Sequence, residues 1–209
     1  MKRNFLLFVL SIFLFSASAF AIDMKLENFF TDKEETAQVY EKETKEARVF
    51  YAQNNLDEAM SILVSIPAEH RSAENWLLMG NIQQDKDNLK EAIFMWESAI
   101  LADEKFYRAY YNLGVLYFTQ EKYALALENF KKAKRYKNDL HIIYYNLGCT
   151  YLSLGEFKKA KNEFLYAIEL KNTEPDYYYN TALVYKKLGN EKKAKYYLDL
   201  YNNMIDSRN

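Results

Sequence analysis

The chain has 209 residues, of which 28 are Lys or Arg and 29 are Asp or Glu, so its formal net charge is −1. A nearly neutral surface produces no strong overall field that would attract nucleic acid, and we therefore expect no nucleic-acid partner. Half of the residues are hydrophobic, whereas only 5 are Gly and 2 are Pro. This composition argues against disorder and against a sheet with many turns, and it favours a packed, mostly helical body.

The N-terminal residues have the pattern of an export signal. Lys2 and Arg3 precede an uncharged apolar run, which is followed by a stretch of small residues. Ala19 and Ala21 satisfy the small-residue rule for cleavage after Ala21, and cleavage after Ala19 is the alternative. We therefore predict that residues 1–21 are a signal peptide and that the mature chain is periplasmic or secreted.

The same segment has a second interpretation, which is an uncleaved membrane anchor. Residues 5–22 carry no charge, and a helix needs about 17 to 25 apolar residues to cross a bilayer. Cleavage is favoured because the second half of the run consists of small residues rather than Leu and Ile. Contact with a membrane, through an inner-membrane anchor, is expected only if the segment is retained.

Residues 22–72 are predicted to form an N-terminal helical cap that contains a degenerate repeat. Thr31 and Glu34 have the spacing of a capping box, which predicts a first helix over about 32–53. Pro67 is expected to shorten the second helix of this segment, since proline removes a backbone donor and clashes with the preceding turn. The many charged residues of the first helix fit a face that is exposed to water at the end of a stack.

One line of sequence recurs through the rest of the chain with a period of 34 residues. "YYNLGVLY" begins at Tyr110, "YYNLGCTY" at Tyr144 and "YYNTALVY" at Tyr178. Such a period predicts a stack of supersecondary units, and two stretches of helical apolar spacing in each unit predict two antiparallel helices per repeat. The four predicted repeats are residues 73–106, 107–140, 141–174 and 175–208.

Three positions of the repeat are predicted to pack the helices together. The fourth position is aromatic, the eighth is small and the twentieth is always alanine. A small residue is required where two helices cross closely, and we expect the fourth-position aromatic ring to fill the space around that contact. The predicted packing residues are Trp76, Gly80, Ala92, Tyr110, Gly114, Ala126, Tyr144, Gly148, Ala160, Tyr178, Ala182 and Ala194.

These motifs, with Ala, Phe and Ala following in the second helix, resemble the tetratricopeptide repeat family. The resemblance covers residues 73–208 and implies an all-α fold, a right-handed superhelical solenoid of antiparallel helix pairs. It implies about four regular repeats in addition to the degenerate one. The sequence departs from the family at the thirty-second position, where Glu104, Asn138 and Asn172 stand in place of the usual Pro.

In proteins of this family, the first helices line a concave groove, so the resemblance implies a non-catalytic scaffold that binds a peptide or protein segment there. Asn can pair with a backbone amide, and Tyr offers a flat surface at small entropic cost. The same residues have an alternative role, which is to brace neighbouring repeats. The groove candidates, at the fifth, sixth, ninth and twelfth positions, are Tyr111, Asn112, Val115, Phe118, Tyr145, Asn146, Cys149, Tyr179, Asn180 and Leu183.

The sequence holds no constellation that predicts catalysis, a metal or a cofactor. His141 and Cys149 fall on one predicted helix about 12 Å apart, too far for a hydrogen bond. No cluster has metal-ligand spacing, and no glycine-rich phosphate loop occurs. The basic segment 131–137 is interpreted as a solvated helix face. The alternatives to a soluble scaffold are a membrane-anchored envelope assembly factor and a module that binds cell-wall glycan or peptide.

Overall fold

The computed structural model describes residues 39–207 of the chain, and these residues belong to two compact units, Met1–His70 and Arg71–Asn209. The predicted signal peptide, residues 1–21, lies outside the described residues, as does the start of the predicted cap. All regular secondary structure in the described part is helical. None of the helices in this part is long and apolar enough to cross a membrane.

The described part of the first unit is a helical hairpin followed by a short turn of 3-10 helix. A helix over residues 39–52 precedes α2 (Leu56–Ser65), and η1 (Ala68–His70) follows. α2 has 10 residues, whereas the second helices of the later repeats have 14 or 16. The helix ends before Pro67, and Ile66 between them is already extended. The predicted shortening by Pro67 is therefore seen.

The second unit consists of eight helices that follow the predicted period. The first helices begin at residues 73, 107, 141 and 175, so the period of 34 residues is the period of the helix pairs. The first helices are α3 (Ala73–Asp85), α5 (Tyr107–Thr119), α7 (His141–Ser153) and α9 (Pro175–Lys187), and the second helices are α4 (Leu89–Ala102), α6 (Tyr123–Tyr136), α8 (Phe157–Leu170) and α10 (Glu191–Asp206).

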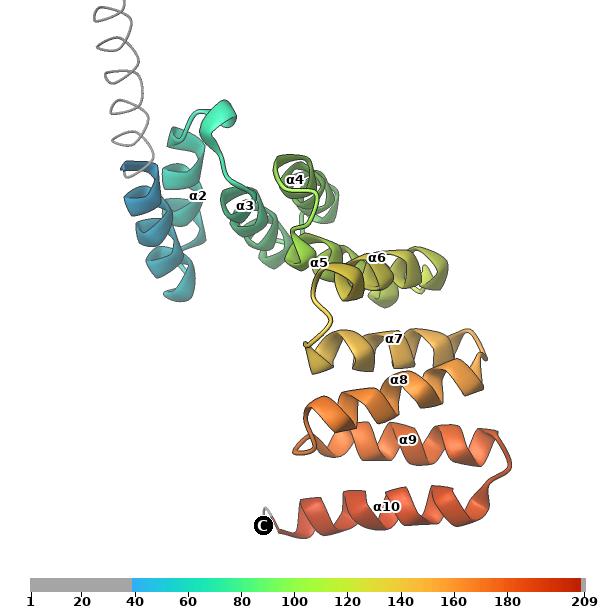
Figure 1. Ribbon diagram of the computed structural model, residues 1–209. Helices are drawn as coiled ribbons and strands as arrows, with labels where there is room; N and C mark the ends of the chain where they lie inside the picture. Colours follow the sequence, from blue (N-terminus) through green and yellow to red (C-terminus); the bar gives the residue numbers. More distant parts are fainter. Residues whose placement is uncertain (1–38, 208–209) are drawn as a thin grey trace, which may run out of the picture. The chain divides into compact units, whose positions relative to one another are not determined.

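Consecutive helices of this unit pack against each other, which produces a stack of antiparallel pairs. Each first helix packs on the second helix of its own repeat, and α4, α6 and α8 each pack on the next first helix. Figure 1 shows α7, α8, α9 and α10 as successive layers. α7 also contacts α5 and α9 directly, whereas the second helices of the described unit approach one another less closely. The first helices therefore lie on the inner side of the stack.

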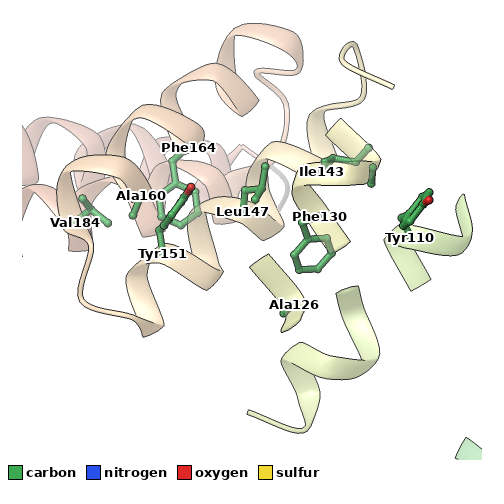
Figure 2. Close-up of a cluster of buried hydrophobic side chains, with 10 residues drawn as sticks. Tyr110, Ala126, Phe130, Ile143, Leu147, Tyr151, Ala160, Phe164 and Val184 are labelled. Atoms are coloured by element: carbon green, nitrogen blue, oxygen red, sulfur yellow. The ribbon is translucent and has the colours of Figure 1, made fainter. Parts of the chain in front are cut away.

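A glycine and a large aromatic ring face each other within each of the first three regular repeats. A Cβ atom added to Gly148 would lie 2.5 Å from the ring of Phe164, and one added to Gly114 would lie 2.7 Å from the ring of Phe130. Gly80 faces Trp96 in the same way. The three rings are almost completely buried, and Figure 2 shows Phe130 and Phe164 within one continuous hydrophobic cluster. The absence of a side chain at the eighth position is therefore required for the ring to insert.

This arrangement corrects one expectation. The ring that fills the space over the glycine comes from the twenty-fourth position, not from the fourth. In the third and fourth regular repeats, the fourth-position tyrosine instead holds the loop that enters its repeat: the Tyr144 hydroxyl donates to the Asn138 carbonyl at 2.6 Å, and the Tyr178 hydroxyl donates to the Asn172 carbonyl at 3.0 Å. These carbonyls belong to the thirty-second position, where the family usually has Pro.

The four hairpins of the second unit close in the same way. The residue at the fifteenth position has a positive φ in every repeat, 61° at Asp87, 59° at Glu121, 73° at Gly155 and 74° at Gly189. The next residue donates to a carbonyl five residues earlier, as Glu156 N does to Tyr151 O at 2.8 Å. This conformation at the end of a helix favours glycine, and Asp87 and Glu121 adopt it without glycine.

Candidate functional site

The ten groove candidates all lie on α5, α7 and α9, the inner helices of the stack. We call the surface that they form the first-helix face. Nine of the ten side chains are partly buried, and Tyr179 is 49% exposed. The face thus combines side chains that contact the rest of the stack with side-chain atoms that reach solvent.

Hydrogen bonds between neighbouring repeats fix the Asn side chains of this face. Asn146 Nδ2 donates to the Tyr111 hydroxyl at 3.1 Å, and Asn180 Nδ2 donates to the Tyr145 hydroxyl at 2.9 Å. In both cases the sixth-position Asn of one repeat bonds to the fifth-position Tyr of the repeat before it. We call these pairs the Asn–Tyr braces. The bracing role that the sequence left open is therefore present in the structure.

The first regular repeat has Leu77 at the fifth position, so it offers no hydroxyl to the next repeat. Asn112 Nδ2 instead donates to Asn81 Oδ1 at 2.7 Å, and Trp96 Nε1 donates to the same oxygen at 3.1 Å. Asn81 was not among the candidate residues, although its ninth-position register placed it on this face. Where the tyrosine is missing, a hydrogen bond between two Asn side chains therefore joins the neighbouring repeats.

A second residue that sequence reasoning missed is Tyr177, which has only 3% of its surface exposed. Its ring stacks on Tyr145 with centroids 4.6 Å apart, and its hydroxyl is 2.6 Å from His141 Nδ1. The third position is aromatic only in the last repeat, and this was the available signal. Tyr177 therefore ties α9 to α7 beside the Asn180–Tyr145 brace.

Burial raises the pKa of Tyr111 and of Tyr145, and it raises the pKa of the adjacent Tyr177 to about 12. The Cys149 thiol is affected in the same way, because burial raises its pKa to about 11. A thiol with such a pKa has little thiolate at neutral pH and is a poor nucleophile. The face is thus suited to hydrogen bonding and apolar contact rather than to acid–base or covalent chemistry.

His141 and Cys149 are held by different partners. His141, the first residue of α7, pairs with Tyr177, and Cys149 lies beside Tyr145. No three His, Cys, Asp or Glu side chains in residues 39–207 are grouped so that they could hold a metal ion. The geometry therefore assembles neither a nucleophile with its base nor a metal centre in the described part.

The second position of the repeats carries an ion pair rather than a free cation. Arg108 Nη1 lies 2.9 Å from each carboxylate oxygen of Glu74 in the preceding repeat. This is the one second-position cation of the four repeats, and the sixth position holds Leu78 and then three Asn. The second and sixth positions therefore offer no unpaired cation to a ligand.

Comparison with family models identifies the repeats. Models described as tetratricopeptide repeat match residues 77–139, 142–174 and 175–201, which together are more than half of the chain. The chain belongs to the tetratricopeptide repeat family. Tetratricopeptide repeats mediate protein–protein interactions, and proteins built from them are generally scaffolds without catalytic activity. The all-α solenoid described above is the fold of this family.

Solved structures of tetratricopeptide repeat proteins share this fold. MamA from Desulfovibrio magneticus RS-1, residues 41 to the end, has a TM-score of 0.71 and 18% identity, with 83% of this chain and 97% of that chain covered. A structure of MamA from AMB-1 has a TM-score of 0.69 and 17% identity, with coverages of 80% and 92%. PilF from Pseudomonas aeruginosa has a TM-score of 0.68 and 20% identity, with coverages of 82% and 77%. At these identities the likeness concerns the fold alone. No curated protein matches the chain in sequence.

Proposed function

We propose that this chain is a non-catalytic scaffold that holds a peptide or protein segment against its first-helix face. The observation that carries the proposal is the state of the Asn side chains. Each Asn–Tyr brace uses one N–H of Asn146 or Asn180. The second N–H and the Oδ1 atom of each amide have no hydrogen-bond partner among the described residues. One donor and one acceptor per repeat thus remain for the N–H and C=O groups of an extended backbone.

The braces also favour binding energetically. A flexible side chain loses rotamer entropy when it is ordered by a ligand, which costs about 0.5 to 1.5 kcal/mol per side chain. Asn146 and Asn180 are already held by the preceding repeat, so little of this cost remains when a segment binds. A structural role and a binding role are therefore compatible in the same residue.

The neighbouring positions indicate the chemistry of the segment. Val115 and Leu183 are partly buried apolar residues, and Tyr179 exposes about half of its surface beside Tyr201. The ten positions of the face hold no charged residue. The segment expected here is uncharged, with apolar side chains that contact Val115, Leu183 and the Tyr179 ring.

The test compares two exposed tyrosines of the same repeat. Tyr179 lies on the first-helix face, whereas Tyr196 lies on α10 and is 58% exposed. An aromatic photo-crosslinking residue replaces each of them in turn in the native cell, with no effect on any brace. We expect the residue at position 179 to capture one defined protein segment and the residue at position 196 not to capture it. Capture of the same segment at both positions, or only at position 196, would contradict binding by this face.

We further propose that the scaffold acts outside the cytoplasm, in the periplasm or outside the cell. The support is the N-terminal pattern of Lys2, Arg3, an apolar run and the small residues that end at Ala21. Mass spectrometry of the protein from its native cell is expected to find a chain that begins at Ile22 or at Phe20. A retained Met1 in the mature protein would contradict cleavage and favour the anchored form.

A further inference from the structure

An open pocket is lined by none of the ten residues of the first-helix face. It has a volume of about 490 Å³ and lies between α8, the end of α9 and the start of α10. Tyr185 and Leu188 contribute apolar surface, and three of the remaining lining residues are lysines: Lys158, Lys161 and Lys193. The Nζ atom of Lys193 lies 5.2 Å from the centroid of the Tyr185 ring.

The positive charge of this pocket is not neutralised by acidic residues of its own lining. No Asp or Glu lines it, and none of its three lysines forms an ion pair with a carboxylate in residues 39–207. A second pocket, on α6, is also basic but differs in this respect. It has a volume of about 430 Å³ and contains Glu128, which pairs with Lys132 at 3.0 Å. The α6 pocket is lined by three cations and one carboxylate, whereas the pocket at α8 and α10 is lined by three cations and no carboxylate.

We propose that this pocket binds an acidic segment of a protein partner, through the three ammonium groups and the apolar wall formed by Tyr185 and Leu188. Charge complementarity favours an anionic ligand, because three lysines line one pocket that has no carboxylate of its own. Side chains of Asp and Glu supply several carboxylates on one flexible chain, and their methylene groups can contact the apolar wall. The site is independent of the first-helix face, and its failure leaves the proposed function untouched.

The lining favours an acidic run over a single carboxylate, because three lysines line one pocket and none of them is paired with a carboxylate among the described residues. Lys159, on the same helix as Lys158 and Lys161, is by contrast paired with Glu156.

The experiment uses the full chain and fluorescently labelled octaglutamate as the probe, with octaglutamine as the uncharged reference. Binding is measured by anisotropy at low and at physiological ionic strength. The test variant carries Lys158→Gln, Lys161→Gln and Lys193→Gln. The control variant carries Lys42→Gln, Lys90→Gln and Lys105→Gln, three exposed lysines that do not line the pocket. Both variants lose the same net charge, so a difference between their affinities for octaglutamate depends on where the lysines lie in the structure.

We expect saturable binding of octaglutamate that weakens with salt. The pocket variant should bind about tenfold more weakly, and the control variant should differ less than about twofold from the native chain. Equal losses in the two variants would overturn the proposal, because they would show attraction by net charge alone. Displacement of octaglutamate by equimolar inorganic phosphate would also overturn it, by indicating a simple anion site. Binding to phosphatidylglycerol vesicles that depends on the pocket lysines, without binding of octaglutamate, would also overturn the proposal. It would indicate that the pocket contacts a membrane surface.

Discussion

The third and fourth regular repeats have the same length and their helices begin at the same positions, but they pack differently inside. In the third, Gly148 lies under Phe164, which is completely buried. In the fourth, the corresponding residues are Ala182 and Leu198, and Leu198 is 40% exposed. The glycine thus occurs where a large ring inserts between the helices, and alanine replaces it where the ring is absent. The eighth and twenty-fourth positions therefore behave as one pair whose combined volume is set by the space between the helices.

Position in the stack explains the difference. α8 packs on both α7 and α9, and Phe164 is completely buried, whereas the main packing partner of α10 among the described helices is α9. A large ring at the twenty-fourth position of α10 would remain partly in water, where its burial gains little. The third repeat is therefore an interior repeat, and the fourth is the last repeat of the described part.

The largest expected effect is the loss of the interior ring. Phe164→Ala removes a fully buried aromatic side chain and should lower the free energy of unfolding by about 3 to 5 kcal/mol. Leu198→Ala removes a side chain that is already partly in water and should cost about 1 kcal/mol or less. Urea unfolding of the two variants measures the difference. Similar losses in both would contradict the distinction between interior and terminal repeats.

The next effect concerns the pairing of the eighth and twenty-fourth positions. Gly148→Ala places a Cβ atom against the Phe164 ring and should cost about 1 to 3 kcal/mol of the free energy of unfolding. In the Phe164→Leu background, which reproduces the pair of the fourth repeat, Gly148→Ala should be neutral or stabilising, because alanine favours a helix by about 0.8 to 1.0 kcal/mol over glycine. A double-mutant cycle of the two sites measures this coupling. An additive cycle would show that the two positions do not act as a pair.

A smaller effect is expected at the fifth position. Tyr145→Phe removes the acceptor of the Asn180 amide and should cost about 0.5 to 1.5 kcal/mol of the free energy of unfolding. Tyr179→Phe is the matched control, because its hydroxyl has no hydrogen-bond partner among the described residues. We expect this control to leave the melting midpoint unchanged. A comparable loss in both variants would argue that the hydroxyl, and not the brace, is the source of the effect.

The smallest effect tests what the third and fourth repeats share. Both have glycine at the positive-φ position of the hairpin, whereas the second repeat has Glu121 there. Glu121→Gly relieves an unfavourable backbone conformation and should stabilise the protein by about 0.5 to 1 kcal/mol after the extra freedom of glycine in the unfolded chain is allowed for. The converse change, Gly155→Ala, should destabilise it. Thermal melts of the two variants are expected to shift in opposite directions.

The helix pairs could be predicted from the sequence because their cause is local and repeated. The period of 34 residues, the apolar spacing and the small eighth position each depend on contacts that recur in every repeat. The identity of the ring above the glycine could not be settled in this way. Both the fourth and the twenty-fourth positions hold large side chains, and only the packing of the second helix on the first distinguishes them.

The site was predicted only in part, for a related reason. The sequence placed Tyr145 and Asn180 on one face, but the brace between them joins different repeats and depends on the separation of α7 and α9. The same spacing, Tyr followed by Asn 35 residues later, was visible in the sequence and could have indicated the pair. The lysine pocket had no such signal, since Lys161 and Lys193 come together only through the packing of α8 on the last helix pair.

The most direct test of the account is the affinity of the segment captured at position 179 for two alanine variants. Tyr179→Ala and Tyr196→Ala each remove an exposed tyrosine from the same repeat and leave both Asn–Tyr braces intact. If the first-helix face holds the segment, Tyr179→Ala should weaken binding by about tenfold or more, as expected for an aromatic contact residue, and Tyr196→Ala should leave it unchanged. Equal affinities for both variants and the native chain, or a loss confined to Tyr196→Ala, would contradict binding by the first-helix face.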